Sequence, residues 1–530
     1  MVSPLMNPLN TTLQRQSPLG FHLPQDILWY TFYFVVQPST DRTRSVFGRS
    51  ALNNLRRLSQ VCASWRELLL ASSSLWGMAL ELNQLSQKTC HWRNEVLRRT
   101  GDSLLDIHCH ICTKDIGVLE QFVKFLLDEH WPRIRSLDID LNKANSTTKG
   151  EEFVRETIDA FQKPAINLKS FRVNLDIHSV KMFTLKLFAD QAPLLQEFWV
   201  HSFRVHPRRP WFYNLRVLHI TCLWTAHELL NTLASMPLLE VLVFNEDHDY
   251  GGTMLDPPVV NKDSLARAVL PQLKELKVDM GTSLAKHLAV LERLIPAPGL
   301  HFGLTSGPLG PTPADLVAFQ RVIGSYLQLA FKNELPRDLQ VVMTEDYILV
   351  YLSKDSGGFK LELEFDHDVP DITILLEPIT SISLEYSTKL TISIRGIAPA
   401  ATDSALSRIL LSSPSIKELH VTSYGLNLLL SLSTSPDNTL FPVLELLRLD
   451  GLQEVRPVLD FLSRRYIQEA PIKCLDLCQY QRAGSCDFHS LEQFSGLKVR
   501  WTGTGGSTEE YTCGSGNAQV LDFTHSFPEP

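Results

Sequence analysis

A short apolar cassette recurs nine times along this chain of 530 residues, and it restricts the fold more than any other feature. In its fullest form, as at 193–200, a proline is followed by apolar residues two, five and seven positions later. The last two apolar residues flank a single position, which predicts a short strand with one buried face. The cassettes lie at 132–139, 168–173, 193–200, 215–220, 237–244, 271–278, 414–421, 442–449 and 471–477. Their first apolar residues are 34, 27, 20, 24 and 34 positions apart in the first run, and 28 and 28 apart in the second.

Helical apolar patterns separate many of these cassettes. They occur at 118–131, 151–161, 226–236, 284–295 and 457–467. One strand and one helix cannot bury their apolar faces alone, so neighbouring units have to stack, and strands that each follow a helix are expected to run parallel. This organisation resembles the leucine-rich repeat, which implies an α/β fold, an irregular solenoid with parallel strands and outer helices. A run of unrelated α/β units is the alternative.

The position between the last two apolar residues of each cassette is expected on the open side of the sheet. These positions hold Asp138, Arg172, Trp199, His219, Val243, Lys277, His420, Arg448 and Asp476. Their mixed charge favours a protein partner over a polyanion, and the candidate substrate-binding residues are Trp199, His219, Lys277 and Arg448. The alternatives are that these are ordinary solvated strand positions, or that Trp199 packs beneath the loop at 206–210.

The middle and the end of the chain depart from the cassette pattern. Residues 296–313 are rich in Pro and Gly and predict a linker or long loop, whereas 341–352 and 359–365 predict two strands joined as a hairpin by 353–358. We therefore expect an insertion, or a break in the solenoid, at about 296–370. Residues from 503 onward are rich in Gly, Ser and Thr and predict disorder.

The amino-terminal region predicts two short amphipathic helices. Pro24 can begin the first helix, after which Ile27, Leu28 and Phe32 belong to a mostly apolar stripe. Ser50 is a plausible N-cap for the second. That helix carries on one face Leu55, Leu58, Val61, Cys62, Trp65, Leu68 and Leu69. Two short helices cannot bury so many large side chains between themselves, so apolar surface is left for a partner.

The order of these residues, Leu23-Pro24, then Val61-Cys62-x-x-Trp65-Arg66, then Leu75-Trp76, resembles the F-box. In particular it resembles an expanded group of F-box proteins with Leu-rich bodies in mushroom-forming fungi. The resemblance implies that the module docks on a Skp-family adaptor and, through it, on a cullin. The implied adaptor contacts are Leu23, Pro24, Ile27, Leu28, Phe32, Val61, Cys62, Trp65, Leu75 and Trp76. The alternative is a helical cap on a larger domain.

The predicted organisation is an F-box at 19–80, a connecting helix or linker at 81–103, a repeat domain at 104–500 and a disordered tail at 501–530. The resemblance implies a non-catalytic substrate-recognition adaptor of a Skp–cullin–F-box ubiquitin ligase, which brings an unknown protein substrate. A scaffold that carries an F-box but does not direct ubiquitination is the alternative.

Composition narrows the classes of partner and compartment. A net charge of -8 from 50 basic and 58 acidic residues argues against nucleic acid and anionic membranes as partners. Windows of eighteen residues all contain charged, proline or polar breaks, so no membrane span is expected. The nine cysteines are an odd number without paired spacing, which suits a reducing compartment such as the cytoplasm or the nucleus.

One cluster, His108-Cys109-His110-Ile111-Cys112, has residues that can bind metal ions. Alternation with Leu105 predicts a strand that buries Cys109 and leaves the histidines on its other face. We therefore predict no metal site and no cofactor, with a metal-dependent enzyme as a much weaker alternative. The sequence also lacks a Gly-Lys-Ser/Thr phosphate loop and a Gly-x-Ser-x-Gly elbow.

Overall fold

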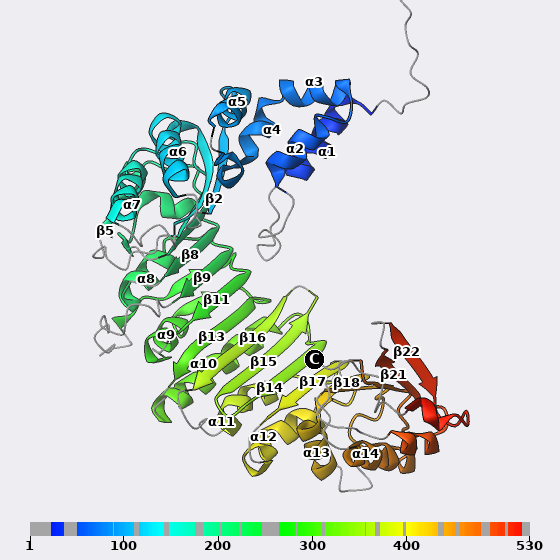
Figure 1. The fold of residues 1–530 in the computed structure, drawn as a ribbon. Coiled ribbons are helices and arrows are strands. Elements are labelled where there is room, and N and C mark those ends of the chain that lie inside the picture. Colours follow the sequence, from blue (N-terminus) through cyan, green and yellow to red (C-terminus); the bar gives the residue numbers. More distant parts are fainter. Residues whose placement is uncertain are drawn as a thin grey trace, which may run out of the picture. The chain divides into compact units, whose positions relative to one another are not determined.

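The protein divides into two compact units, Met1–Asp140 and Leu141–Pro530. The computed structural model describes residues 23–36, 50–87, 89–110, 116–141, 148–174, 184–201, 204–221, 224–245, 264–281, 284–309, 313–355, 357–365, 372–395, 399–432, 439–450, 455–478, 488–503 and 507–521. The fold is mixed α/β, with a large and mostly parallel sheet accompanied by helices (Figure 1). The predicted domain border at residue 103 falls inside the first unit.

The first unit begins with short helices and continues into three parallel strands. Its helices are α1 (Gln25–Val36), α2 (Ala51–Leu58), α3 (Ala63–Ala71), α4 (Ser73–Met78), α5 (His91–Thr100) and α6 (Ile116–Glu129), with 3₁₀ turns η2 (Leu82–Leu85) and η3 (Trp131–Arg133). Strands β1 (Leu80–Glu81), β2 (Leu105–His110) and β3 (Ile134–Asp140) pair in parallel in that order. The helical module and the first strands therefore belong to one folded body.

The second predicted helix is in fact two helices, so this prediction was wrong. Cys62 has extended backbone angles, with φ -154 and ψ 170, and these end any continuous helical hydrogen bonding. The side chain of Arg66 in α3 reaches back across the break, where its Nε donates to the carbonyl of Ser59 at 2.9 Å. The break changes which way the apolar residues face, because α2 and α3 do not share one axis.

The second unit is built on one long ladder of strands. In spatial order they are β4 (Ser170–Asn174), β6 (Glu197–His201), β8 (Val217–Thr221), β9 (Val241–Asn245), β11 (Glu275–Asp279), β13 (His301–Leu309), β16 (Gly357–Phe365), β15 (Tyr347–Lys354), β14 (Asp338–Met343), β17 (Lys389–Ile394), β18 (Glu418–Thr422), β19 (Leu446–Asp450), β20 (Cys474–Asp476), β21 (Lys498–Thr502) and β22 (Thr508–Thr512). Each of the nine cassettes supplies a strand. From β4 to β13 all neighbours are parallel, which confirms the predicted parallel stacking.

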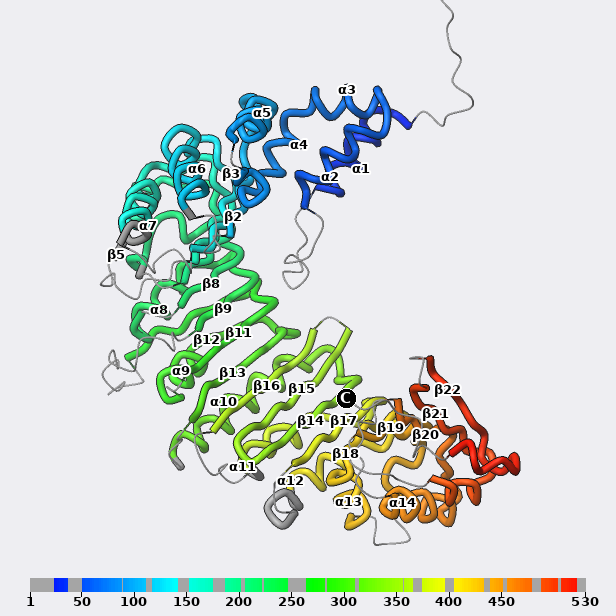
Figure 2. The backbone as a smooth tube through the Cα atoms, in the orientation of Figure 1, coloured from blue at the N-terminus to red at the C-terminus, as the bar shows by residue number. Residues whose placement is uncertain are grey.

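Helices line one side of this ladder (Figures 1 and 2). They are α7 (Thr148–Phe161), α8 (Ala226–Leu233), α9 (Leu284–Leu291), α10 (Pro313–Ala330), α11 (Ile372–Leu376), α12 (Pro399–Leu411), α13 (Ser423–Leu432) and α14 (Arg456–Ile467). Among the described residues, the 3₁₀ turn η5 (Leu187–Asp190) lies between β4 and β6, and the 3₁₀ turn η6 (Pro210–Asn214) lies between β6 and β8. The remaining 3₁₀ turns are η9 (Glu377–Ser381), η10 (His489–Gln493) and η11 (Ala518–Leu521), and two small parallel pairs join β5 (Thr184–Leu185) to β7 (Arg204–Val205) and β10 (Ala268–Leu270) to β12 (Leu294–Pro296).

The core lies between the strands and these outer elements. Phe171 of β4 contacts Phe161 of α7 edge-on, with ring centroids 5.0 Å apart, and stacks on Phe198 of β6 at 5.7 Å. Trp211 of η6 lies 4.9 Å from Phe198 and continues the same cluster. Large aromatic side chains therefore fill the core between β4, β6 and their outer elements.

The region 296–370, predicted as an insertion or a break, pairs with the ladder on both sides, but its strands leave the sequential order because β16 and β15 lie between β13 and β14. Strand β13 occupies much of the stretch predicted as a linker, and it pairs in parallel with β16, while β14 pairs in parallel with β17. Among the strands of this region, only β15 runs antiparallel to both of its neighbours. The predicted hairpin exists as β15 and β16, but the stretch 341–352 is not one strand, because it turns at Thr344–Asp346.

The predicted disorder near the end of the chain is also wrong for residues 508–512. Strand β22 pairs antiparallel with β21. Glu510 of β22 accepts hydrogen bonds from Lys498 at 2.9 Å and from Arg500 at 2.7 Å. Tyr511 is buried and its hydroxyl donates to Glu492 of η10, so the ladder ends in a paired, partly covered strand.

A buried lysine ties β15 to the end of α10. Lys354 is 7% exposed, and its Nζ donates to the carbonyls of Gly299 at 3.0 Å and Ala330 at 2.8 Å. Ala330 is the last residue of α10, whose terminal carbonyls have no helical partner. We expect Lys354→Met to lower the free energy of unfolding by about 1–3 kcal/mol, because it leaves buried carbonyls without a donor.

Hydrogen exchange of peptides from 313–365 in the full chain measures this loss, with Lys360→Met on the partly exposed face of β16 as the matched control. Burial lowers the pKa of Lys354, so the unfolded chain binds more protons than the folded one just below the ordinary lysine pKa. The wild type should therefore gain stability as the pH rises through that window, and the Lys354 variant should lack this gain. An equal loss of unfolding free energy in the two variants would contradict a special structural role for Lys354.

Candidate functional site

The outer face of α1 carries an exposed apolar stripe. Leu23 and Ile27 are 53% and 49% exposed, and Tyr30 and Phe34 are 56% and 69% exposed. The spacing of three and four residues places Ile27, Tyr30 and Phe34 on one side of the helix, and Leu23 lies just before its first residue. The sequence had assigned Phe32 to the same stripe as Ile27, but Phe32 is fully buried on the opposite side. We call the four exposed residues the α1 stripe.

The break between α2 and α3 adds further exposed residues. Val61 is 61% exposed, and Cys62 is exposed beside it. The hydroxyl of Ser64, 3.2 Å from the sulfur, lowers the pKa of the Cys62 thiol. Trp65, the next large residue, is partly covered and packs edge-on against Phe32 with centroids 5.0 Å apart.

Three of the predicted adaptor contacts lie in the core instead. Phe32, Leu75 and Trp76 are fully buried, so a partner cannot reach them without rearrangement. The Trp76 indole Nε1 donates to the carbonyl of Leu69 at 2.9 Å, and the guanidinium of Arg99 lies 4.5 Å from the ring centroid. The remaining predicted contacts are exposed or partly exposed, namely Leu23, Pro24, Ile27, Leu28, Val61, Cys62 and Trp65.

On the second unit, the side of the sheet not covered by helices presents the predicted row of side chains; we call this side the open face. The strand register aligns Arg172, Trp199, His219, Val243 and Lys277 as direct neighbours across β4, β6, β8, β9 and β11. A second stretch aligns His420, Arg448 and Asp476, of which Asp476 is buried. Asp138 is the corresponding residue of β3 in the first unit and neighbours His108.

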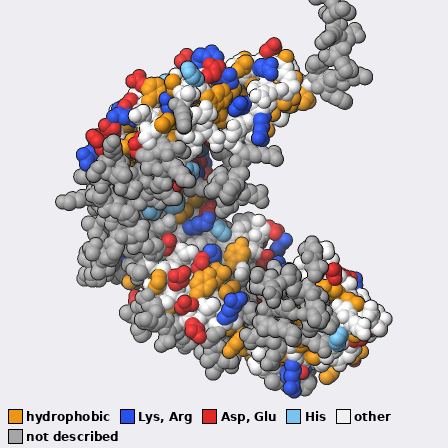
Figure 3. Space-filling view, in the orientation of Figure 1, with side chains coloured by type: hydrophobic (Ala, Val, Ile, Leu, Met, Phe, Trp, Pro, Cys, Tyr) orange, Lys and Arg blue, Asp and Glu red, His pale blue; other side chains and the backbone are white. Residues whose placement is uncertain are grey.

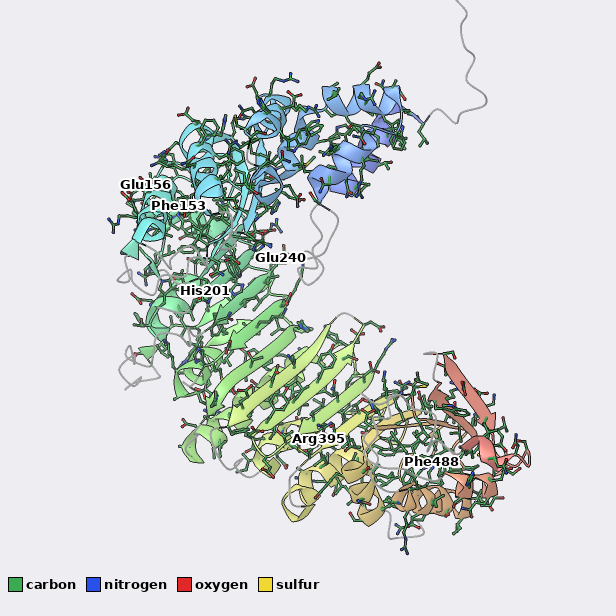
Figure 4. All side chains as sticks on the ribbon, in the orientation of Figure 1. Phe153, Glu156, His201, Glu240, Arg395 and Phe488 are labelled. Carbon is green, nitrogen blue, oxygen red and sulfur yellow. The ribbon has the colours of Figure 1, made fainter. Side chains whose placement is uncertain are left out.

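Trp199 stands at the centre of a small aromatic and apolar group. Its ring meets His219 edge-on at 5.0 Å and stacks on His201 at 6.4 Å, the latter labelled in Figure 4. The partly exposed residue Val217 lies on the neighbouring strand β8, and Val241 and Val243 lie one strand farther, on β9, directly opposite Val217 and His219. Trp199, Val217, Val241 and Val243 form the first apolar patch. Polar groups border it, since Arg172 pairs with Glu197 at 2.9 Å.

A second apolar patch, which the sequence did not predict, lies farther along the open face. It comprises the partly exposed residues Val342 of β14 and Leu349 and Tyr351 of β15, with Leu349 directly opposite Val342. Figure 3 shows hydrophobic side chains gathered over this part of the sheet among charged ones. At its edge the hydroxyl of Tyr347 donates to Glu362 at 2.9 Å, and burial raises the pKa of Tyr347 to about 12.

Charged side chains occupy the strands between the two patches. On β11, Lys277 pairs with Glu275 at 2.5 Å, and Asp279 follows on the same face. On β16, Lys360 pairs with Glu362, and Glu364 follows it. The two lysines thus share this surface with four carboxylates, so the surface between the patches has an acidic surplus.

The carboxy-terminal part of the open face is occupied by ion pairs among its own residues. His420 Nε2 lies 2.6 Å from a carboxylate oxygen of Asp450, and Arg448 donates to Asp476 at 3.0 Å. Arg448, a predicted substrate contact, is therefore already engaged.

The histidines of β2 face the same way as each other, as the strand prediction required. Cys109 is buried, His108 Nδ1 lies 3.8 Å from Asp138 and His110 Nδ1 lies 3.3 Å from Asp140. Cys112, the other cysteine of the cluster, lies outside the described residues. Within the described part of the chain, no three His, Cys, Asp or Glu side chains are grouped so that they could hold a metal ion.

Two surfaces therefore stand out, the α1 stripe with Val61 and the open face with its two patches. No family model matches the chain, and no curated protein matches it either. Among the helices that the structure describes, none is long and apolar enough to cross a membrane. Both surfaces have apolar side chains bordered by polar ones, which is the composition of protein-binding sites.

Proposed function

We propose that this protein is the substrate-recognition adaptor of a Skp–cullin–F-box ubiquitin ligase. The observation that carries the proposal is the exposed α1 stripe, within residues whose order resembles the F-box. Large apolar side chains such as Ile27 and Phe34 are costly to leave in water, and an apolar stripe on a short helix suits a partner groove. In this proposal the Skp-family adaptor covers the stripe and links the chain to a cullin.

The second unit has the complementary role in this proposal. Its strand and helix units resemble leucine-rich repeats, and its open face offers a long surface with apolar and charged groups to a protein substrate. The chain itself performs no chemistry here, because ubiquitin transfer belongs to other subunits of such ligases. The proposed setting is the cytoplasm or the nucleus.

Two exposed residues give the sharpest test of adaptor binding. We expect the double variant Ile27→Asp, Val61→Asp to lose co-purification with a recombinant Skp-family adaptor. Interface anchors are worth about 2 kcal/mol or more each, so the double change should weaken binding by roughly 10²–10³-fold. Both side chains are exposed, so the melting temperature should stay unchanged.

The matched control is Ile467→Asp on α14, an exposed isoleucine of the second unit that should leave adaptor binding intact. Full binding by the double variant would refute the α1 stripe as the adaptor surface. A wild-type chain that captures the adaptor but never a cullin would instead favour the alternative, a scaffold without a role in ubiquitination.

A further inference from the structure

We propose that the open face of the second unit binds an extended, basic peptide segment that carries two apolar anchor residues. This inference rests on the proposed function, because it names the class of substrate that such a receptor would take. It concerns the surface from β6 to β14, where two apolar patches flank a stretch with surplus acidic charge.

The two patches are the first part of the argument. Trp199 with Val217, Val241 and Val243 forms one, and Leu349 with Val342 and Tyr351 forms the other. In many of the other strands the open-face positions hold polar or charged residues, as the pairs His420–Asp450 and Arg448–Asp476 show. Two separate apolar patches on a mostly polar face suit two apolar side chains of one ligand, each seated in its own patch.

The spacing of the patches sets the form of the ligand. From β9 the ladder runs through β11, β13 and β16 to β15. Four steps of about 4.8 Å between neighbouring strands separate the patches by about 19 Å. An extended chain advances about 3.3 Å per residue, so the anchors should be about six residues apart. A single helix would need about thirteen residues for the same distance, because it rises only 1.5 Å per residue.

The acidic side chains between the patches determine which residues the ligand should have between its two anchors. Lys277 and Lys360 each pair with a carboxylate of their own strand, Glu275 and Glu362. Asp279 and Glu364 extend the acidic surplus to two charges on the same surface. Lysine or arginine between the anchors is therefore attracted, whereas acidic residues, nucleic acids and anionic lipid surfaces are repelled.

The test uses the full chain and four pools of fluorescent dodecapeptides, with binding measured by fluorescence polarisation. The first pool has Leu or Phe at positions 3 and 9, Lys or Arg at positions 5 and 7, and small polar residues elsewhere. The second pool replaces the basic residues with Asp or Glu, and the other two each lack one anchor. We expect the first pool to bind at least tenfold more tightly than any other.

Variants assign the effect to the two features. Val243→Ser on β9 and Leu349→Ser on β15, at the two strands from which the spacing is measured, should each reduce binding of the two-anchor pool to the level of a single-anchor pool. Glu364→Gln, a change at an exposed residue, should reduce the preference for basic over acidic peptides while keeping the preference for two anchors. Tyr386→Ala, at an exposed aromatic outside both patches, is the matched control and should change nothing.

The outcomes separate this inference from the proposed function. Absence of binding by every pool, equal binding of basic and acidic pools, or binding that survives both anchor variants would overturn the peptide proposal. Each variant is also assayed for capture of the Skp-family adaptor, which should be unchanged because the α1 stripe is intact. A chain that selects the basic two-anchor peptides but captures no adaptor would keep this inference and refute the ligase assignment.

Discussion

Replacing Trp76 with alanine should cost the first unit about 3–5 kcal/mol, the usual loss for a large buried aromatic. Trp76 is fully buried, its Nε1 donates to the carbonyl of Leu69, and the guanidinium of Arg99 lies against its ring. Trp92 of α5 meets the ring edge-on at 6.4 Å. The indole therefore joins α3, α4 and α5, and its loss should open all three together.

Hydrogen exchange of peptides from 50–110 in the full chain measures this effect without averaging over the second unit. Trp76→Phe keeps most of the volume but loses the indole N–H, so it should cost about 1–3 kcal/mol by leaving the Leu69 carbonyl without a donor. Trp65→Ala is the comparison at a partly exposed tryptophan, and it should cost less than Trp76→Ala. A larger loss at Trp65 would mean that Trp65, and not Trp76, is the main core tryptophan of this unit.

The sequence predicted where helices and strands lie better than it predicted which apolar side chains are buried. Helical periodicity placed Ile27 and Phe32 in one stripe, yet the structure exposes the first and buries the second. Whether an apolar residue is buried depends on the elements that pack beside it, and these are distant in the sequence. Trp76 is buried because α4 packs on β2 and α5, and no local pattern contains that information.

The cassettes were predicted well because their signal is local. The alternation at 197–201 and 241–245 needs only neighbouring residues to indicate a buried face, and both became parallel strands with the expected side chains outward. The candidate residues Trp199, His219 and Lys277 consequently lie in one row. Their role in binding stays a prediction, since the geometry establishes only their neighbourhood.

The linker predicted at 296–313 is wrong, because the proline and glycine residues there do not prevent a strand. Strand β13 contains Gly303, Gly307 and Pro308, yet it pairs on both sides. Its register with β16 shifts between Thr305 and Pro308, and such an irregularity accommodates a residue that has no N–H to donate. Because 296–370 was set aside as an insertion, the second apolar patch on β14 and β15 went unpredicted.

Replacing Phe302 with alanine should show whether this middle region belongs to one continuous stack. Phe302 of β13 is fully buried, lying 4.7 Å from Tyr326 of α10 and 5.3 Å from Phe359 of β16 between ring centroids. Its register neighbour on the other side is Leu276 of β11. We expect a loss of about 3–5 kcal/mol, with Tyr386→Ala at an exposed aromatic as the control.

The spread of that loss distinguishes the two architectures. In a continuous stack each repeat is stabilised by its neighbours, so a cavity at Phe302 should increase hydrogen exchange in β9 and β11 on one side and in β16 on the other. An independent insertion would confine the increase to residues 296–370. Protection from exchange that falls on both sides of β13 would show that both patches belong to one ladder. The strands of one ladder keep a fixed separation, so this result would also support the spacing on which the two-anchor peptide depends.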